Sequence, residues 1–242
     1  MLRSFSFLGT GLIGQGYCSR ICFNRAMKFK QLLLAASAHL AKNDPRLAVL
    51  ISKYGDCRIL PHSDHYSELV SSIVGQQLSV KAAATIWQRV LALSGGNAPT
   101  PHQLLKIDTE ALRNCGLSYA KVAYVKDLAA HILDGRLDMN HIASLPNDEV
   151  ITQLTAVKGI GEWSAHMFLI FSLGRLDVLP VGDLGIKKGA QRVYSLKELP
   201  NAQKLEQLSK KYKWAPYESV AAWYLWKGLD NTPTQTRHDS IA

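Results

Sequence analysis

Asp183 is the acidic residue whose surroundings point most directly to chemistry. It follows Pro180-Val181-Gly182 and precedes a segment predicted to be a helix. The apolar residues of that segment recur at helical spacing: Leu184, Ile186, Ala190 and Val193. An aspartate in this place caps a helix N-terminus, and the helix dipole favours its ionised form. An ionised carboxylate can also stabilise a developing cation or position a water molecule. The residues alone leave both roles open.

A glycine-flanked turn lies upstream, in VKGIGEW (residues 157–163). Gly159 and Gly161 flank Ile160 between two apolar segments, and Ile160 is expected to pack between the two helices. Glycine allows positive φ and a close approach of the backbone to another molecule. The N-terminus of the second helix, beside Lys158, would then offer unpaired amides to a phosphate. An ordinary helix–turn–helix with a glycine C-cap is the alternative.

These two features sit in a chain that reads as helices with short connectors. Helices are predicted over residues 28–42, 45–53 and 64–74, near 109–114, and over 202–211 and 216–227. Others begin at Ser79, after Ser118 and at Pro146-Asn147, the last leading into the glycine hairpin. A further helix follows Asp183 and ends near Tyr194. Asp64, Ser79 and Ser118 are placed to cap three of them. Pro216 is expected in the first turn of the last helix and Gly228 just beyond its end. The sequence predicts an all-α domain of roughly ten helices.

Composition limits the class of protein. The chain has 242 residues, 47% hydrophobic and 19% charged, with a formal net charge of +9. That balance supports a buried core and favours a polyanionic partner such as nucleic acid. No apolar run is long enough to suggest a membrane span. The four cysteines (18, 22, 57 and 115) form neither a zinc pattern nor a disulfide framework,. The eight histidines show no metal spacing, and His62 and His65 are expected to have surface or capping roles.

The first 26 residues are basic and contain no acidic residue. They are expected to form an extension, with three interpretations open: a disordered segment, an organelle-targeting leader, or an upstream start with the true start at Met27. The polar tail, residues 231–242, is expected to be flexible.

Three ordered motifs resemble one family. LTAVKGIGEWSA (residues 154–165), followed by a Pro/Gly loop and Asp183, is similar to the helix-hairpin-helix DNA glycosylase superfamily. SSIVGQQLSVKAAATIW (residues 71–87) and GLSYAKVAYVKDLA (residues 116–129) strengthen the match to its 3-methyladenine DNA glycosylase II branch. The resemblance spans roughly residues 45–230.

The resemblance implies roles around the damaged base. Asp183 occupies the catalytic position. Trp163 stands where bifunctional members have a nucleophilic lysine, so the chain is expected to lack lyase activity. It also lacks the four-cysteine cluster of the iron–sulfur branch. Trp163, Met167 and Trp226 are expected to bind the base; a core role is the alternative for Trp163 and an equal alternative for Trp226.

The resemblance also implies roles in holding DNA. Gln76, Gln77 and Leu78 form the turn expected to enter the minor groove, with Gln77 as the wedge that fills the gap left by a flipped nucleotide. Lys158, Gly159 and Gly161 are expected to bind the DNA backbone. The main-chain carbonyls of Thr155, Val157 and Ile160 are expected to hold a monovalent cation, Na⁺ or K⁺. Lys187, Lys188 and Arg192 are expected to be surface cations first and DNA contacts second.

The combined expectation is a monofunctional DNA glycosylase with two helical lobes, about 61–175 and 27–60 plus 183–230, within a domain of residues 27–230. Asp183 is expected in a cleft between the lobes.

The expected substrate is duplex DNA with alkylated purines, above all 3-methyladenine. No cofactor is expected to be required, and the protein is expected to be a monomer located with the DNA, in the bacterial cytoplasm or eukaryotic nucleus. Two alternatives are a non-catalytic hairpin protein that binds DNA damage and a glycosylase of the same fold for oxidised or mismatched bases.

Overall fold

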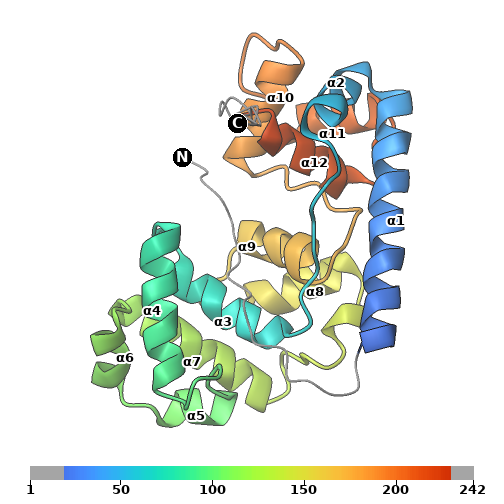
Figure 1. The fold of residues 1–242 in the computed structure, drawn as a ribbon. Helices are drawn as coiled ribbons and strands as arrows, with labels where there is room; N and C mark the ends of the chain where they lie inside the picture. The colour runs from blue at the N-terminus through green and yellow to red at the C-terminus, as the bar shows by residue number, and fades with distance from the viewer. Residues whose placement is uncertain (1–18, 230–242) are drawn as a thin grey trace, which may run out of the picture. The chain divides into compact units, whose positions relative to one another are not determined.

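The computed structural model describes residues 19–229, and the segments described there are helices, turns and loops without a β-strand (Figure 1). The α-helices are α1 (Ser19–Asn43), α2 (Pro45–Tyr54), α3 (His65–Gly75), α4 (Val80–Ala92), α5 (Pro101–Lys106), α6 (Thr109–Cys115), α7 (Tyr119–Leu133), α8 (Asn147–Thr155), α9 (Glu162–Met167), α10 (Leu184–Val193), α11 (Ala202–Lys211) and α12 (Glu218–Lys227). A 3₁₀ turn, η1 (Ile142–Ser144), and a π turn, η2 (Phe168–Ser172), complete them. The all-α prediction is confirmed. Within residues 19–229, no helix has the length and apolar character needed to span a bilayer.

The chain divides into two compact units. Among the described residues, the first unit, called here the hairpin unit, contains residues 59–178 together with residues 19–26. The second, called here the carboxylate unit, contains residues 27–58 and 179–229. In the hairpin unit, α7 packs on α3, α5 and α6, and α8 packs on α9. In the carboxylate unit, α12 packs on both α2 and α10. Each unit therefore has its own helical core.

The predicted caps are present. The side chains of Asp64, Ser79 and Ser118 accept hydrogen bonds from the backbone N–H groups of Ser67, Ala82 and Lys121. Each cap satisfies one of the amides that the first turn of a helix leaves without an intrahelical partner. The starts of α3 and α4, the helices that flank the predicted wedge turn, and the start of α7 are fixed in this way.

Three helix predictions differ from the structure. Helix α1 begins at Ser19, so the last part of the expected N-terminal extension is helical; residues 1–18 and the tail from 230 lie outside the described residues. Helix α5 was not predicted, because its six residues are too few to show a periodic pattern; a capping box between Thr100 and Gln103 marks its start,. Pro216 is not in the first turn of α12, because the Tyr217 N–H closes a turn on the Trp214 carbonyl and the helix begins at Glu218.

A buried aspartate joins the sequence-distant parts of the carboxylate unit. Asp44 is fully buried. Its Oδ1 caps α2 by accepting from the N–H groups of Arg46 and Leu47, at 3.0 and 3.2 Å. Its Oδ2 accepts from the Tyr194 hydroxyl and from Trp214 Nε1, at 2.5 and 2.8 Å. Burial, followed by the bond to Asp44, raises the pKa of Tyr194 and keeps this hydroxyl a donor. One carboxylate thus ties α2 to the chain segments on either side of α11.

We expect Asp44→Ala to lower the free energy of unfolding by roughly 3–5 kcal/mol, because four donors, three of them in buried bonds, lose their acceptor at once,. The matched control is Asn201→Ala, which removes the exposed N-cap of α11. In the described structure this cap accepts one hydrogen bond, from the Lys204 N–H. That change should cost about 1 kcal/mol. Urea unfolding of the two variants measures the difference, and equal midpoints would show that Asp44 is only a helix cap.

Candidate functional site

The hairpin between α8 and α9 has the geometry that its glycines predict. The Ile160 N–H donates to the Val157 carbonyl at 3.1 Å and closes the turn. Ile160 is 5% exposed, which confirms that it packs into the unit. Gly159 has φ +81°, a backbone conformation that favours glycine,. A Cβ at Gly159 would also overlap the ring of Tyr124, which lies on α7. This position therefore requires glycine for two independent reasons.

Gly161 has a different role in the same hairpin. It is the N-cap residue of α9, with φ −93°, and a Cβ there would meet open space. In the described structure no side chain caps this end of α9. The N-terminus of a helix carries the positive end of the helix dipole, which favours an anion beside it. Lys158 is exposed beside this end of α9; its N–H donates to Asp127 Oδ2 at 2.9 Å, and its Nζ lies 3.9 Å from Asp127 Oδ1.

The second predicted DNA contact is the turn between α3 and α4, formed by Gln76, Gln77 and Leu78. Gln77 has φ +59°, in the left-handed region that non-glycine residues seldom occupy,. Gln77 is exposed, and Leu78 is 39% exposed. Gln76 differs, because its side-chain Nε2 donates to the Gly159 carbonyl at 2.9 Å. The structure thus presents Gln77 and Leu78 outward and joins Gln76 to the hairpin.

Three side chains of α7 hold these two segments, and none of them was singled out from the sequence. Lys121 Nζ donates to the carbonyls of Val74 and Gln76, at 2.8 and 2.7 Å. Tyr124 lies against Gly159, and Asp127 accepts from Lys158. Burial lowers the pKa of Lys121. Their spacing of three residues within GLSYAKVAYVKDLA places them along one face of a helix, a signal that the sequence did contain,.

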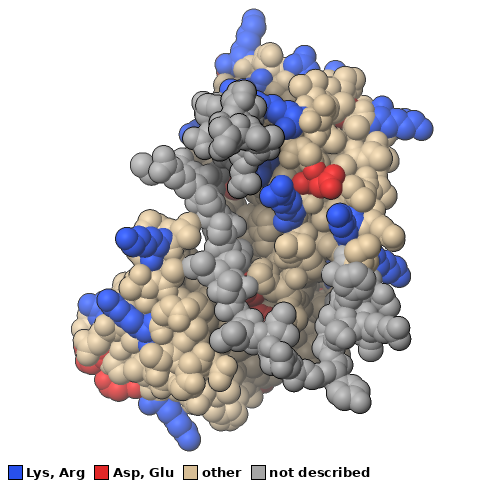
Figure 2. Space-filling view, in the orientation of Figure 1, with Lys and Arg blue, Asp and Glu red and all other residues tan. Residues whose placement is uncertain are grey.

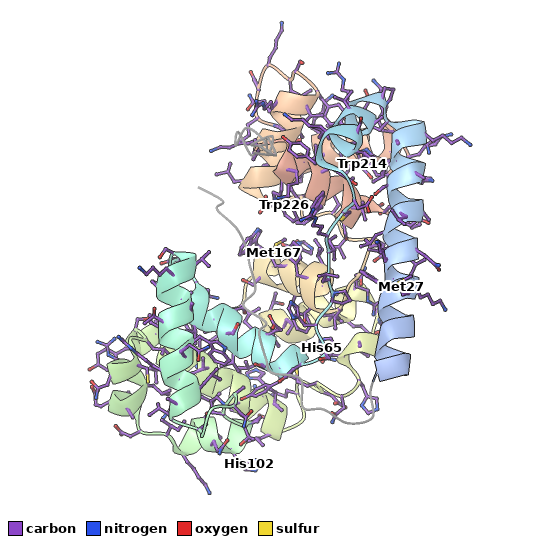
Figure 3. The ribbon with its side chains drawn as sticks, in the orientation of Figure 1. Met27, His65, His102, Met167, Trp214 and Trp226 are labelled. Carbon is purple, nitrogen blue, oxygen red and sulfur yellow. The ribbon has the colours of Figure 1, made fainter. Side chains whose placement is uncertain are left out.

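Asp183 caps α10, as predicted, and it is 3% exposed. Its Oδ1 accepts from the Ile186 N–H at 2.7 Å and from Trp226 Nε1 at 2.8 Å. Trp226 projects from α12 in the same unit, where Figure 3 labels it. Two N–H donors therefore converge on one carboxylate oxygen and fix the rotamer of Asp183.

The remaining predicted pocket residues lie on α9. Trp163 is half-buried and Met167, four residues later, is 6% exposed. Residues four apart in a helix share a face, so the two side chains project from one face of α9. The structure thus bonds Asp183 to Trp226 within the carboxylate unit and places Trp163 and Met167 on one face of α9 in the hairpin unit.

Charge is unevenly divided between the units. The described residues of the carboxylate unit from 27 onward carry 15 Lys and Arg against 6 Asp and Glu. Residues 59–178 carry 9 Lys and Arg against 11 Asp and Glu. Figure 2 shows lysine and arginine side chains over the part of the surface that carries α2, α10 and α11. The basic character of the chain therefore resides mainly outside the unit that holds the hairpin.

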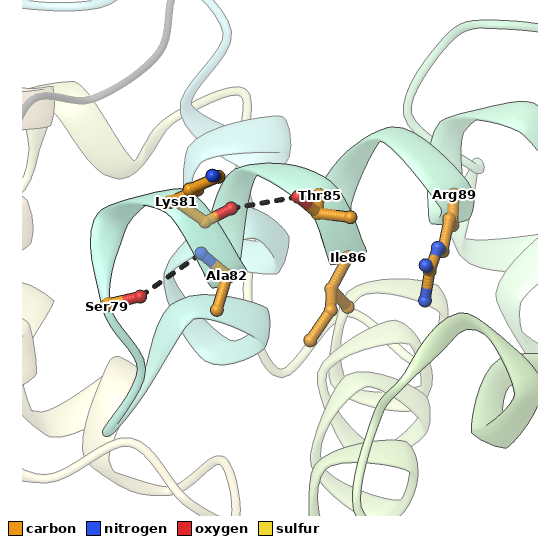
Figure 4. A pocket seen from close by; sticks show the side chains of 6 residues that line it. All are labelled: Ser79, Lys81, Ala82, Thr85, Ile86 and Arg89. Carbon is orange, nitrogen blue, oxygen red and sulfur yellow. Dashed lines mark hydrogen bonds between the residues drawn. The ribbon is translucent and has the colours of Figure 1, made fainter.

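A hollow of about 410 Å³ lies along α4, directly after the α3–α4 turn (Figure 4). Its lining residues are Ser79, Lys81, Ala82, Thr85, Ile86 and Arg89. Lys81 and Arg89 add two cations to this hollow, and Lys81 lies in the first turn of α4, directly after the wedge turn. Among residues 19–229, no cluster of three or more His, Cys, Asp or Glu side chains is arranged to hold a metal ion.

His62 and His65 have partners within the hairpin unit. His62 Nδ1 lies 3.3 Å from Glu68 Oε1, and His65 Nδ1 lies 2.9 Å from the Ser172 hydroxyl. Burial lowers the pKa of His62, while burial and then the nearby Asp64 charge raise the pKa of Glu68 to about 7. These contacts give both histidines structural roles.

Comparison with known proteins gives a consistent result. The family model described as HhH-GPD superfamily base excision DNA repair protein matches residues 70–214. DNA-3-methyladenine glycosylase 1 of Schizosaccharomyces pombe is 38% identical over 200 residues, which are 81% of this chain and 87% of that protein.

Two solved structures are similar over most of their length. DNA-3-methyladenine glycosidase from Bacillus halodurans has a TM-score of 0.74 and 42% identity, covering 81% of this chain and 89% of that one. The 3-methyladenine DNA glycosylase of Schizosaccharomyces pombe, in complex with abasic DNA, has a TM-score of 0.69 and 35% identity, covering 80% and 95%.

The hairpin geometry predicts opposite outcomes for its two glycines. Gly159→Ala should lower the free energy of unfolding by about 2 kcal/mol or more, because the new Cβ meets the Tyr124 ring at a positive φ,. Gly161→Ala, the matched control, should stay within about 0.5 kcal/mol of the wild type. Urea midpoints compare the two, and a similar loss in both would contradict this description of the turn.

Proposed function

Because the chain belongs to the HhH-GPD superfamily of base excision DNA repair proteins, we infer that it is a DNA glycosylase. It hydrolyses the N-glycosidic bond of alkylated purines in duplex DNA, 3-methyladenine and related N3- or N7-alkylated bases, and leaves an abasic site. The single observation that carries the chemistry is the buried Asp183 carboxylate, fixed by the Ile186 amide and the Trp226 indole.

One carboxylate is sufficient for this reaction. An alkylated purine already carries positive charge, so the leaving base needs little protonation. The sugar develops oxocarbenium character as the bond breaks, and a nearby anion stabilises that charge. Asp183 is the N-cap of α10, where the positive end of the helix dipole interacts favourably with negative charge,. We assign Asp183 as the catalytic residue, either stabilising the sugar cation directly or orienting the attacking water.

Trp226 acquires a role beside the predicted one. Its indole N–H donates to Asp183 Oδ1, so we assign it first as a positioning residue for the carboxylate. The ring remains exposed in part and can still contact a base. An indole N–H donates hydrogen bonds and accepts none. Trp226 therefore orients Asp183 by donating to its Oδ1.

Trp163 and Met167 support selection of a cationic base. An electron-rich indole face attracts a positively charged ring, and Met167 adds an apolar wall. Trp163 has no amine that could form a Schiff base with the sugar. We therefore propose that the enzyme is monofunctional and leaves the DNA strand intact.

The grip on DNA combines three parts. The first-turn amides of α9, with Gly161 and Lys158, bind a backbone phosphate. Gln77, with Leu78 beside it, enters the duplex and fills the gap left by the flipped nucleotide. The basic surface of the carboxylate unit, including Lys187, Lys188 and Arg192, supplies long-range attraction that weakens as salt rises.

The hairpin also offers ligands for a monovalent cation. The carbonyls of Thr155, Val157 and Ile160 are neutral oxygen donors, the type that suits Na⁺ or K⁺. Val157 O already accepts from the Ile160 N–H, but a carbonyl has a second lone pair,. The Gly159 carbonyl, which accepts from Gln76, is not in this set. The residues fit such an ion, and when bound it would add positive charge beside the phosphate.

Asp183→Asn should reduce the single-turnover rate of base excision by about 10²–10³-fold, because a neutral amide cannot stabilise the sugar cation. Asparagine still caps α10 well, so the fold and the affinity for duplex with an abasic-site analogue should be retained. Trp226→Phe should reduce the rate less, by roughly tenfold, through the lost bond to Asp183.

The control is Asp56→Asn, an exposed acid in the same unit, which should excise at the wild-type rate. Rates are measured on oligonucleotides that contain one methylated purine. An Asp183→Asn variant that excises as fast as the Asp56→Asn variant would remove Asp183 from the reaction.

A further inference from the structure

Helix α7 contacts both of the segments assigned to DNA. Toward the α3–α4 turn, Lys121 Nζ donates to two main-chain carbonyls, those of Val74 at 2.8 Å and Gln76 at 2.7 Å. These carbonyls lie at the C-terminal end of α3, where unpaired acceptors and the negative end of the helix dipole attract a cation. Lys121 is half-buried, so these bonds are only partly screened by water.

Toward the hairpin, the same helix makes two further contacts. The Tyr124 ring lies directly against the Gly159 backbone, and Asp127 Oδ2 accepts from the Lys158 N–H at 2.9 Å. The two DNA-facing segments are also bonded to each other, because Gln76 Nε2 donates to the Gly159 carbonyl at 2.9 Å. This bond joins residues 83 positions apart in the chain. The turn and the hairpin therefore form one connected assembly.

We propose that Lys121 and Gln76 are positioning residues that couple the hairpin to the wedge turn, so that phosphate binding at the hairpin and insertion of Gln77 occur as one step. The proposal rests on the glycosylase function inferred above and assigns the coupling to residues that contact neither the reacting base nor Asp183.

The backbone of the turn gives the physical reason. Gln77 has φ +59°, which a residue with a Cβ keeps only where its surroundings impose it,. Lys121 holds the carbonyl of the preceding residue, and the Gln76 side chain holds the same residue to the hairpin. Without these bonds the turn can relax to an ordinary conformation. Gln77 would then no longer project outward before DNA binds. Ordering it during insertion would cost conformational entropy that the wild type has already lost on folding.

Insertion can be measured without catalysis. The probe is a duplex that contains a tetrahydrofuran abasic-site analogue with 2-aminopurine beside it, whose fluorescence rises when wedge insertion disturbs its stacking. The wild type should give this rise, and Lys121→Met and Gln76→Leu should each lose most of it. Lys121→Arg keeps a cation with several donors and should restore it. Lys126→Met, five residues along α7, is the matched control and should behave as the wild type.

Excision in two DNA contexts separates positioning from general damage to the fold. A methylated purine in a fully paired duplex needs the wedge, whereas the same base in a single-nucleotide bulge is already easier to extrude. Lys121→Met should lower the single-turnover rate on the duplex by roughly 10–30-fold, the scale of one charged hydrogen-bonding group. On the bulge it should lower the rate by less than about threefold.

Equal losses on the two substrates, or full 2-aminopurine signal in both Lys121→Met and Gln76→Leu, would overturn the coupling. If Lys121→Met does not fold, Gln76→Leu decides alone, because it removes one side-chain bond and leaves the backbone carbonyl contact of Lys121. A wild type that excises neither substrate would refute the glycosylase function, while the fluorescence comparison would still decide whether these residues position the wedge.

Discussion

A buried carboxylate is stable only where hydrogen-bond donors replace the water that it has lost. At Asp183 those donors are the first-turn amide of α10 and the indole of α12, both bonded to Oδ1. The two bonds hold the carboxylate in one rotamer, and a fixed carboxylate is what stabilisation of a sugar cation needs. The rest of the carboxylate unit serves this geometry, because α12 packs on both α10 and α2.

The same unit contains a second buried aspartate with a different task. Asp44 accepts from two backbone amides, a tyrosine and a tryptophan, and it holds α2 to the segments around α11. Asp183 resembles it in combining an N-cap with a tryptophan donor. Asp44 accepts structural donors on both of its oxygens, whereas Asp183 stands at the position to which the family resemblance assigns catalysis. On this basis we propose chemistry for Asp183 and stability for Asp44.

Local features of the fold were predictable from the sequence. Asp64, Ser79, Ser118 and Asp183 cap their helices because an acceptor precedes a periodic apolar segment in each case. Gly159 could be recognised as the turn residue, since the flanking helices leave few alternatives. Helix α5 was missed because a single turn and a half has no measurable period.

Long-range contacts could not be predicted in this way. The bonds from Lys121 to Gln76 and from Gln76 to Gly159 join residues 45 and 83 positions apart, and no local pattern encodes such pairs. Gln76 was therefore predicted to contact DNA, while in the structure its amide nitrogen is bonded to the hairpin. Trp226 was predicted as a pocket aromatic from its position, and only the structure reveals its bond to Asp183. Base-binding and DNA-binding roles of individual residues remain predictions.

Base release from methylated DNA decides whether the protein is a glycosylase that acts by hydrolysis. Genomic DNA treated with dimethyl sulfate is incubated with the full-length protein, and the soluble fraction is separated by chromatography while the strands are sized before and after alkali. We expect free 3-methyladenine, with strands that stay intact until alkali cleaves the abasic sites. Absence of any free methylated base would contradict the glycosylase function, and strand breaks before alkali would contradict hydrolysis without lyase chemistry.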